Sequence, residues 1–530
     1  MSPLSLGQTA VTAVTAAAGD PTDYIKAPSI SYAALAPMLI VLGGACVGVL
    51  VEALAPRGLR YAGQMVVTLG SLLAALIAVI ALHGRSLTTV AGAVAVDGVA
   101  LFIQGTILVL AVLSMLLIAD RGVEPGGAIV ASAAVTVGSP ADRRLATSGR
   151  LQTEVFPLGL FAVGGMLIFT SANNLLLMFV ALEVLSLPLY LMAGLARRRR
   201  LLSQEAAIKY FLLGAFASAF FLYGVALLYG YANSVDLGAI LAAQSTSSHS
   251  DSLLYLGFGL LVVGLLFKAG VAPFHSWTPD VYQGSATPVT SFMASCTKIA
   301  AFGAILRVLY VGFSVSAWDW RPLIWAVAIT SMVVGAVFGL TQTDLKRILA
   351  YSSIAHAGFI LTGLVALDQA GLSSVLFYLT AYGFTTVAAF GMVMLVRDAN
   401  GEATHLSQWS GLARRSPLFA ATFTFLLLAL AGIPLTSGFT GKFVVFRAAY
   451  HIAAPLVVIG LIASAVAAFF YLRIVVMMFF AEPAEDGPTV TVPTVLAYIP
   501  IFAGVLLTAV LGVFPQWLIE LTNNAAKLRG

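Results

Sequence analysis

The chain has 530 residues, of which 60% are apolar and only 9% are charged, and its mean hydropathy is +0.99. Soluble domains carry roughly 25% charged residues, so this composition excludes a soluble protein and predicts an integral membrane protein. The formal net charge of +5 calls for no nucleic-acid partner, because membrane topology explains where the basic residues lie.

The first 28 residues are rich in Ala, Thr and Ser and lack the basic start and apolar stretch of a cleaved signal peptide. Apolar runs close to the ~20 residues that span a bilayer then recur along the chain. They predict an all-α polytopic membrane protein with about fourteen transmembrane helices. The predicted spans are 31–52, 63–83, 97–119, 154–171, 173–196, 204–231, 252–283, 286–310, 321–341, 345–367, 371–397, 417–451, 453–480 and 493–517.

The 27 basic residues are spread unevenly over the predicted loops. Five lie in one set of alternate loops and at the termini: Lys26, Arg85, Arg321, Lys527 and Arg529. Fifteen lie in the other set: Arg57, Arg60, Arg121, Arg143, Arg144, Arg150, Arg197, Arg198, Arg199, Arg200, Lys346, Arg347, Arg397, Arg414 and Arg415. By the positive-inside rule the richer side is cytoplasmic, so both termini are predicted to face outward.

The remaining seven basic residues lie inside the spans or near their ends. Three are arginines towards helix ends, where their side chains could reach the interface: Arg307, Arg447 and Arg473. The other four are lysines: Lys209, Lys268, Lys298 and Lys442. A lysine at the centre of a membrane helix costs roughly 2.5–3.5 kcal/mol, so its presence indicates a function.

Lysine gives up its proton on burial more readily than arginine, so a row of buried lysines suits proton transfer. Glu183, in the middle of the fifth span, adds a carboxylate at the same depth. The alternative is that each lysine is a passive partner of a carboxylate. Lys209 follows Glu205 by four residues, and a helix-stabilising ion pair explains it equally well. His275 and His356 are either hydrogen-bonded structural residues or proton carriers.

Two of the predicted spans contain Gly and Pro in the middle, with a lysine nearby. The seventh has Lys268 and Pro273, and the twelfth has Pro434 and Lys442. Each is the fourth in a run of five helices, and the two runs begin on opposite sides of the membrane. This pattern predicts an inverted repeat with two discontinuous helices, which in transporters mark the ion path.

The predicted organisation therefore has six parts. They are an N-terminal extension (1–30), three helices (31–119), a cytoplasmic loop (120–153), the two repeats (154–310 and 311–480), and a C-terminal helix with a tail (481–530). Cys46 and Cys296 both lie in apolar segments and are predicted to be small buried residues. The sequence has no CxxC motif, Cys-rich or His-rich cluster, or glycine-rich nucleotide motif, so neither a metal nor a cofactor site is predicted.

Three stretches resemble a known family: FKAGVAPFHSWTPDVYQGSATPVTSFMASCTK at 267–298, EAAIKYFLLGAFASAFFLYG at 205–224 and DLKRILAYSSIAHAGF at 344–359. They are similar to the antiporter-like subunits of proton-pumping NADH:quinone oxidoreductase (respiratory complex I), which are related to Mrp-type sodium/proton antiporters. Asp280-Val281-Tyr282 resembles the N-type subunits, where the other branches usually have Asp-Ala-His. Gly-Phe-x-Gly-Lys-Phe at 438–443 fits the N or L type.

The resemblance implies a proton relay of Glu183, Lys209, Lys268, Lys298 and Lys442, with His275 and His356 as further candidates. Glu183 would be the glutamate of the fifth helix and Lys268 its partner on the broken seventh. Lys298 would connect to Lys442 on the broken twelfth helix, with His356 as a bridge. Quinone chemistry elsewhere in the complex would shift the charge balance of the first pair, and the lysines would pass a proton outward.

The resemblance also implies that the chain itself binds no cofactor or metal. NADH, FMN, iron–sulfur clusters and quinone are expected in partner subunits, which include other antiporter-like and small membrane-arm subunits. The expected location is the bacterial inner membrane, with lipid as the surroundings and no nucleic acid as a partner. One alternative is a subunit of an Mrp-type sodium/proton antiporter. Another is a structural scaffold whose lysines only form ion pairs.

Overall fold

The computed structural model describes residues 29–124, 126–130, 135–136, 138–147, 152–246, 251–398, 401–483 and 487–529. The predicted extension 1–30 and part of the predicted loop 120–153 therefore lie outside the described residues. The helices are α2 (Tyr32–Leu54), α3 (Arg57–Ala81), α4 (Gly98–Ala119), α5 (Pro140–Thr147), α6 (Val155–Ser171), α7 (Leu175–Ala193), α8 (Arg200–Ala232), α9 (Leu237–Thr246), α10 (Asp251–Ala269), α11 (Trp277–Gly284), α12 (Thr287–Phe292), α13 (Lys298–Arg307), α14 (Ala317–Thr341), α15 (Leu345–Leu364), α16 (Gln369–Leu395), α17 (Leu412–Arg415), α18 (Pro417–Ala431), α19 (Ser437–Phe480), α20 (Val495–Val513) and α21 (Gln516–Ala525).

Two π-helical turns, η1 (Met293–Thr297) and η2 (Val308–Gly312), continue α12 and α13, and η3 (Leu406–Trp409) is a 3-10 turn. Strands β1 (Leu87–Thr89) and β2 (Val94–Val96) pair antiparallel. Strand β3 (Val396–Asp398) pairs antiparallel with both β4 (Gly401–Glu402) and β5 (Thr489–Val490). These short sheets close the ends of a helix bundle.

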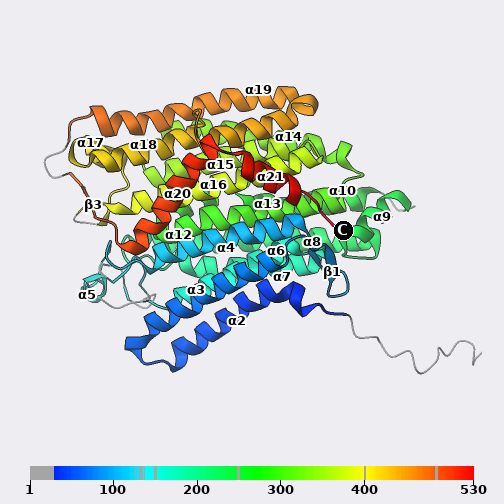
Figure 1. Ribbon diagram of the computed structural model, residues 1–530, viewed down its shortest axis with the longest axis horizontal. Coiled ribbons are helices and arrows are strands. Elements are labelled where there is room, and N and C mark those ends of the chain that lie inside the picture. The colour runs from blue at the N-terminus through cyan, green and yellow to red at the C-terminus, as the bar shows by residue number, and fades with distance from the viewer. Residues whose placement is uncertain are drawn as a thin grey trace, which may run out of the picture.

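In the described part of the chain, eleven helices are long and apolar enough to cross a membrane. Figure 1 shows the long helices running in nearly one direction, with α5, α17 and β3 at one end of the bundle and β1 and α9 at the other. The fold is therefore that of a multi-pass membrane protein, as predicted. Four short helices, α5, α9, α17 and α21, fall outside the predicted spans.

The centre of the bundle is formed by the 287–312 segment and α16, whose most apolar windows are 100% buried within the chain. In α2 and α3 the corresponding windows are only 39% and 28% buried, so these helices lie at the periphery. Central helices can carry polar residues because their hydroxyls bind helix carbonyls. Thr380 and Thr385 of α16, for example, donate to the carbonyls of Leu376 and Ala381.

Both predicted helix interruptions are confirmed. Helix α10 ends at Ala269 and α11 begins at Trp277, while α18 ends at Ala431 and α19 begins at Ser437. A glycine with positive φ follows each broken end: Gly270 at +68° and Gly432 at +85°. Only glycine adopts this conformation without strain, so it stops the helix. A further interruption lies at Ala453, where φ is −139° and ψ is 42° inside the 44-residue α19.

The arginine-rich loops meet at one end of the bundle. Glu124 forms ion pairs with Arg198 (2.9 Å) and Arg397 (3.1 Å) from two other loops. Asp142 pairs with Arg200, and its pKa is lowered first by a hydrogen bond from the Gly138 amide and then by this arginine. Loops that are distant in sequence are thus held together on the side that the arginine counts assign to the cytoplasm.

The two ends of the described chain lie at the opposite end of the bundle (Figure 1). The amide of Ser31 donates to Thr89 Oγ1 (2.9 Å), and Arg529 donates to the carbonyl of Ser86 (2.5 Å). Both ends of the described chain are therefore attached to the same 86–89 segment.

Arg307 contradicts the prediction that it reaches the membrane interface, because its side chain is 0% exposed. It binds both carboxylate oxygens of Asp97, at 2.9 and 2.8 Å, and the carbonyl of Thr170 at 3.1 Å. The sequence could not indicate Asp97 as the partner of Arg307 because it lies 210 residues away.

The prediction that both cysteines are buried is correct for Cys296 and wrong for Cys46, which is exposed.

We expect Asp97→Asn to destabilise the protein strongly, because Arg307 then stays buried without a counter-charge, which costs about 3–5 kcal/mol. Asp97 also caps α4 through the Ala100 amide, but asparagine caps a helix equally well. The matched control is Asp368→Asn at the cap of α16, where the carboxylate binds the Gly371 amide. Thermal unfolding of the purified complex measures the difference. Equal melting temperatures for the two variants would contradict the expectation.

Candidate proton-relay site

Lys268 lies in the last turn of α10, directly before the break, and is 4% exposed. Its ammonium donates to Ser186 Oγ at 2.8 Å and to the hydroxyl of Tyr210 at 3.2 Å. The rings of Tyr190 and Tyr210 lie 5.8 and 5.3 Å from the same nitrogen. The site is therefore polar, but no carboxylate among the described residues is bound directly to the ammonium.

Glu183 lies on α7 one helical turn before Ser186, so both residues lie on one face of that helix. Among the described residues, no hydrogen bond or ion pair joins Glu183 directly to Lys268. Its Oε1 atom is buried without a hydrogen-bond partner in the described structure. Glu183 thus lies one helical turn from the serine whose hydroxyl accepts a hydrogen bond from Lys268.

Lys209 lies apart from the buried row. Its side chain is 41% exposed and forms ion pairs with Glu205 (2.6 Å) and Asp280 (2.7 Å). Asp280 also binds Arg347 at 2.6 Å. The ion pair with Glu205 that the spacing predicted is present, and the carboxylate from α11 adds a second partner.

Lys298 begins α13 and is 3% exposed. Its ammonium donates to the carbonyl of Ser353 on α15 at 2.7 Å and lies 5.8 Å from the Tyr382 ring. One turn further along α15, His356 is 3% exposed and lies 2.8 Å from the hydroxyl of Tyr378 through Nδ1. Its Nε2 lies 3.4 Å from the hydroxyl of Tyr471.

Lys442 lies on α19 beside the second break and is 6% exposed. Its ammonium donates to the carbonyls of Leu430 (3.2 Å) and Ala431 (2.7 Å), which end α18, and to Ser464 Oγ (2.8 Å). The ring of Phe359 lies 4.9 Å from it. The broken helix thus supplies free carbonyls for the lysine, which an uninterrupted helix could not do.

His275 lies in the first break and is only partly buried. Its Nδ1 atom is buried without a partner among the described residues, and its ring lies 6.5 Å from that of Tyr351. The structure does not place it against any of the buried lysines.

Several groups at the site could not be predicted from the sequence. Ser186 and Tyr210 hold Lys268, and Tyr378 and Tyr471 hold His356. The only local signal is the position of Ser186 one turn after Glu183. Lys346, predicted in a cytoplasmic loop, is instead 2% exposed in the first turn of α15 and binds the carbonyl of Ser285 at 2.6 Å.

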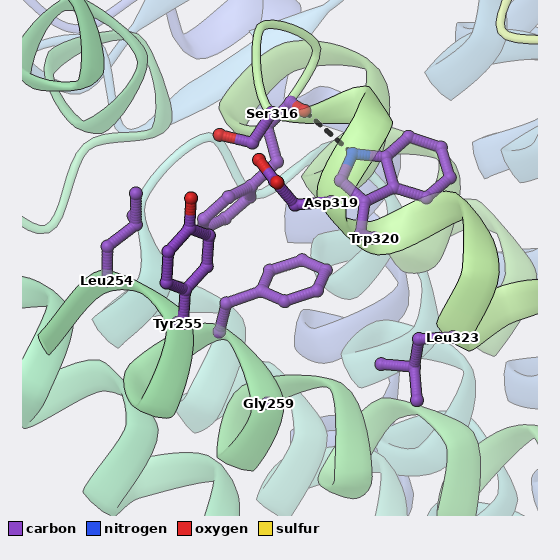
Figure 2. A pocket seen from close by; sticks show the side chains of 9 residues that line it. Leu254, Tyr255, Gly259, Ser316, Asp319, Trp320 and Leu323 are labelled. Carbon is purple, nitrogen blue, oxygen red and sulfur yellow. Dashed lines mark hydrogen bonds between the residues drawn. The ribbon is translucent and has the colours of Figure 1, made fainter. Parts of the chain in front are cut away.

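A cavity of about 170 Å³ lies between the start of α10 and the start of α14 (Figure 2). Tyr255 and Asp319 lie on its walls, together with Trp320, whose indole donates to the carbonyl of Phe313 at 2.8 Å. None of the predicted relay residues lines this cavity. Among the described residues, no group of three or more His, Cys, Asp or Glu side chains could hold a metal ion.

A multi-pass bundle with two broken helices and buried lysines defines the class of antiporter-like membrane subunits. The family described as "NADH:quinone oxidoreductase/Mrp antiporter, TM" matches residues 172–470, more than half of the chain. NADH-quinone oxidoreductase subunit N of Saccharopolyspora erythraea is 61% identical over 94% of this chain and 98% of its own. The same subunit of Parafrankia sp. is 60% identical over 95% of this chain and 96% of its own.

A chain of respiratory complex I from Thermus thermophilus is 35% identical, with a TM-score of 0.74 over 91% of this chain and 98% of its own. A chain of the Mrp complex from Dietzia sp. has a TM-score of 0.79 over 94% and 97%, but at 21% identity it shows the fold alone. The chain belongs to the subunit N family of NADH-quinone oxidoreductase, and is a membrane subunit of that enzyme. The Mrp-type alternative is supported by the shared fold and by a family description that covers both groups, but the relatives of 60% and 61% identity are subunit N proteins.

Proposed function

We propose that the chain carries protons across the membrane through Glu183, Lys268, Lys298, His356 and Lys442. The observation that carries this proposal is the set of acceptors around Lys268, Lys298 and Lys442. Each ammonium is bound only by hydroxyls and backbone carbonyls among the described residues. A lysine that served only as an ion partner would be expected to contact a carboxylate. The test is the proton-to-electron ratio of complexes in which these lysines are replaced one at a time.

Helix α15 supports the bridging role of His356. Ser353, His356 and Phe359 are spaced by three residues and lie on one face of this helix. Ser353 contacts Lys298 and Phe359 contacts Lys442, so the imidazole lies between the two lysine sites. A neutral imidazole can accept a proton at one nitrogen and release one from the other, which suits this position.

Lys209 and His275 are included in the relay on the basis of the family resemblance, because both side chains are partly exposed and lie outside the buried row. Their place would be at its periphery, where Lys209 forms ion pairs with both Glu205 and Asp280. We also propose that NADH, FMN, iron–sulfur clusters and quinone are bound by partner subunits, and that other antiporter-like and small membrane subunits pack against this chain. The absence of nucleotide and cysteine-cluster motifs from the sequence supports this division.

The proposed membrane arrangement has fourteen spans. Eleven long apolar helices are the starting point. Helices α6 and α15 add two spans, and α19 counts as two because it is interrupted at Ala453, which brings the total to fourteen. The proposed repeats, 154–310 and 311–480, then each contain five spans with a broken fourth, and they start at opposite ends of the bundle. Three preceding helices (31–119) and a C-terminal helix with its tail (481–530) complete the proposed organisation, with 120–153 as a cytoplasmic loop.

We propose that the arginine-rich end faces the cytoplasm of a bacterial inner membrane and that both termini face outward. Arg57 begins α3 and Arg85 follows its end, and both are exposed, so one helix offers both sides for a test. In a Cys46→Ser background, a membrane-impermeant maleimide added to intact cells should label Arg85→Cys but not Arg57→Cys. Permeabilised cells should show labelling at both sites. Labelling of only position 57 in intact cells would reverse the proposed orientation.

A further inference from the structure

A groove of about 500 Å³ lies between α3, α4, α16 and α21. Its walls are largely apolar and include Leu76, Ile80, Phe102, Phe384 and Leu521. The amphipathic helix α21 (red in Figure 1) contacts both α16 and α4 and forms one wall. None of the residues proposed for the proton relay lines this groove.

The mouth of the groove is basic. His83, Arg85 and Lys527 line it and are exposed, and no Asp or Glu is among the residues that line it. In the described structure, neither the guanidinium of Arg85 nor the ammonium of Lys527 has a hydrogen bond or an ion pair. The nearby carboxylate of Asp97 does not neutralise them, because it is already bound to Arg307 and the amide of Arg529.

The depth of the groove matches one leaflet of a bilayer. Its lining residues on α4 run from Gly98 to Val109, which is about 16 Å at ~1.5 Å per residue. This is half of the ~30 Å hydrocarbon core. A transmembrane helix from a partner would continue across the second leaflet and would gain nothing from two unpaired cations at the mouth.

We propose that this groove binds an acyl chain of an anionic glycerophospholipid, whose phosphate contacts Arg85 and Lys527. Basic residues at a membrane surface attract anionic headgroups, while the apolar walls favour the chain. The C-terminal tail helps to form the site, since Arg529 binds the Ser86 carbonyl next to Arg85 and thereby holds Lys527 at the mouth. The inference rests on the membrane location of the chain and is independent of the proton relay.

The test uses the whole complex in liposomes that contain phosphatidylglycerol with a photoreactive group in one acyl chain. A phosphatidylcholine probe with the same chain is the comparison, and mass spectrometry locates the labelled peptides. We expect phosphatidylglycerol to label residues 98–109 and 516–525 in preference to phosphatidylcholine. Arg85→Gln and Lys527→Gln should each reduce this labelling about fivefold, whereas Arg57→Gln, at the other end of α3, should not.

A second variant tests the groove itself rather than its charge. A Cβ added at Gly105 would meet only Val79, at 3.6 Å, so a larger side chain has room to extend into the groove. Gly105→Leu should abolish the labelling in an assembled complex, and Gly105→Ala should preserve it. Equal labelling of the native groove by both lipids would show contact with bulk lipid only and would overturn the proposal. The peripheral helix α2 serves as a reference that lipid should reach. If the probes label α2 but not the groove, a partner subunit fills the groove, and the proposal is overturned too.

Discussion

Replacing Lys268 with alanine is expected to reduce coupled proton translocation at least about tenfold, equivalent to about 1.4 kcal/mol or more, while the complex still assembles. The ammonium is buried and bound by neutral oxygens, so its removal breaks no ion pair on which the fold depends. It removes the group next to Glu183 that would hold the proton. Vesicles that contain the variant complex, with assembly checked on a native gel, give the proton-to-electron ratio.

Two further replacements separate proton transfer from charge. Lys268→Arg should fail as well, because arginine keeps its proton throughout the cycle. Glu183→Gln should impair translocation because Glu183 is the only acidic residue of α7 and lies one turn from Ser186. Arg57→Ala, an exposed residue at the bundle end, is the control and should pump normally. A normal ratio in an assembled Lys268→Ala complex would mean that the lysine is structural.

Gly432→Ala is expected to produce the second large loss of proton translocation, because it displaces the side chain of Lys442. The residue has a φ of +85°, which costs a non-glycine residue about 1–2 kcal/mol. The added Cβ would lie 2.9 Å from Cδ and 3.0 Å from Nζ of Lys442. The flexible lysine would have to move away from the carbonyls that end α18. We therefore expect a large loss of proton translocation and only a small decrease in the unfolding temperature. Proton translocation and thermal unfolding of the complex measure the two effects separately.

The control for this variant is Gly70→Ala on α3, where a new Cβ meets nothing within 4 Å. It should leave both translocation and the unfolding temperature unchanged. If Gly432→Ala pumps normally in an assembled complex, the position of Lys442 against the broken helix is not required for proton transfer.

The sequence predicts the long helices and both breaks well, because these features depend on local signals. Bilayer thickness sets the length of an apolar run, and glycine and proline mark where a helix stops. The sequence also identifies Lys268, Lys298 and Lys442 as candidate relay residues, since a lysine inside an apolar run is costly wherever its partners lie. The short helix α21 was missed because ten amphipathic residues resemble a polar tail.

What the sequence could not provide are contacts between distant segments. Arg307 near a helix end is typical of a side chain that reaches the interface, and only the packing against Asp97 shows that it is buried. The same reason applies to Lys346, which sits at a helix start but is covered by the segment around Ser285. Tyr378 and Tyr471 look like ordinary aromatic residues of membrane helices until the fold brings their hydroxyls to His356.

The surroundings of Lys268, Lys298 and Lys442 have a consequence for how the chain stores charge. Among the described residues no carboxylate is bound directly to these three ammonium groups, and only Lys268 has a carboxylate, Glu183, close by, so each proton that is taken up adds positive charge inside a poorly polarisable interior. Like charges repel there over longer distances than in water. In the proposed relay, a proton on one lysine therefore makes the next lysine harder to load. Release of a proton from the lysine at one end of the row then lowers the free-energy cost of protonating the lysine at the other end.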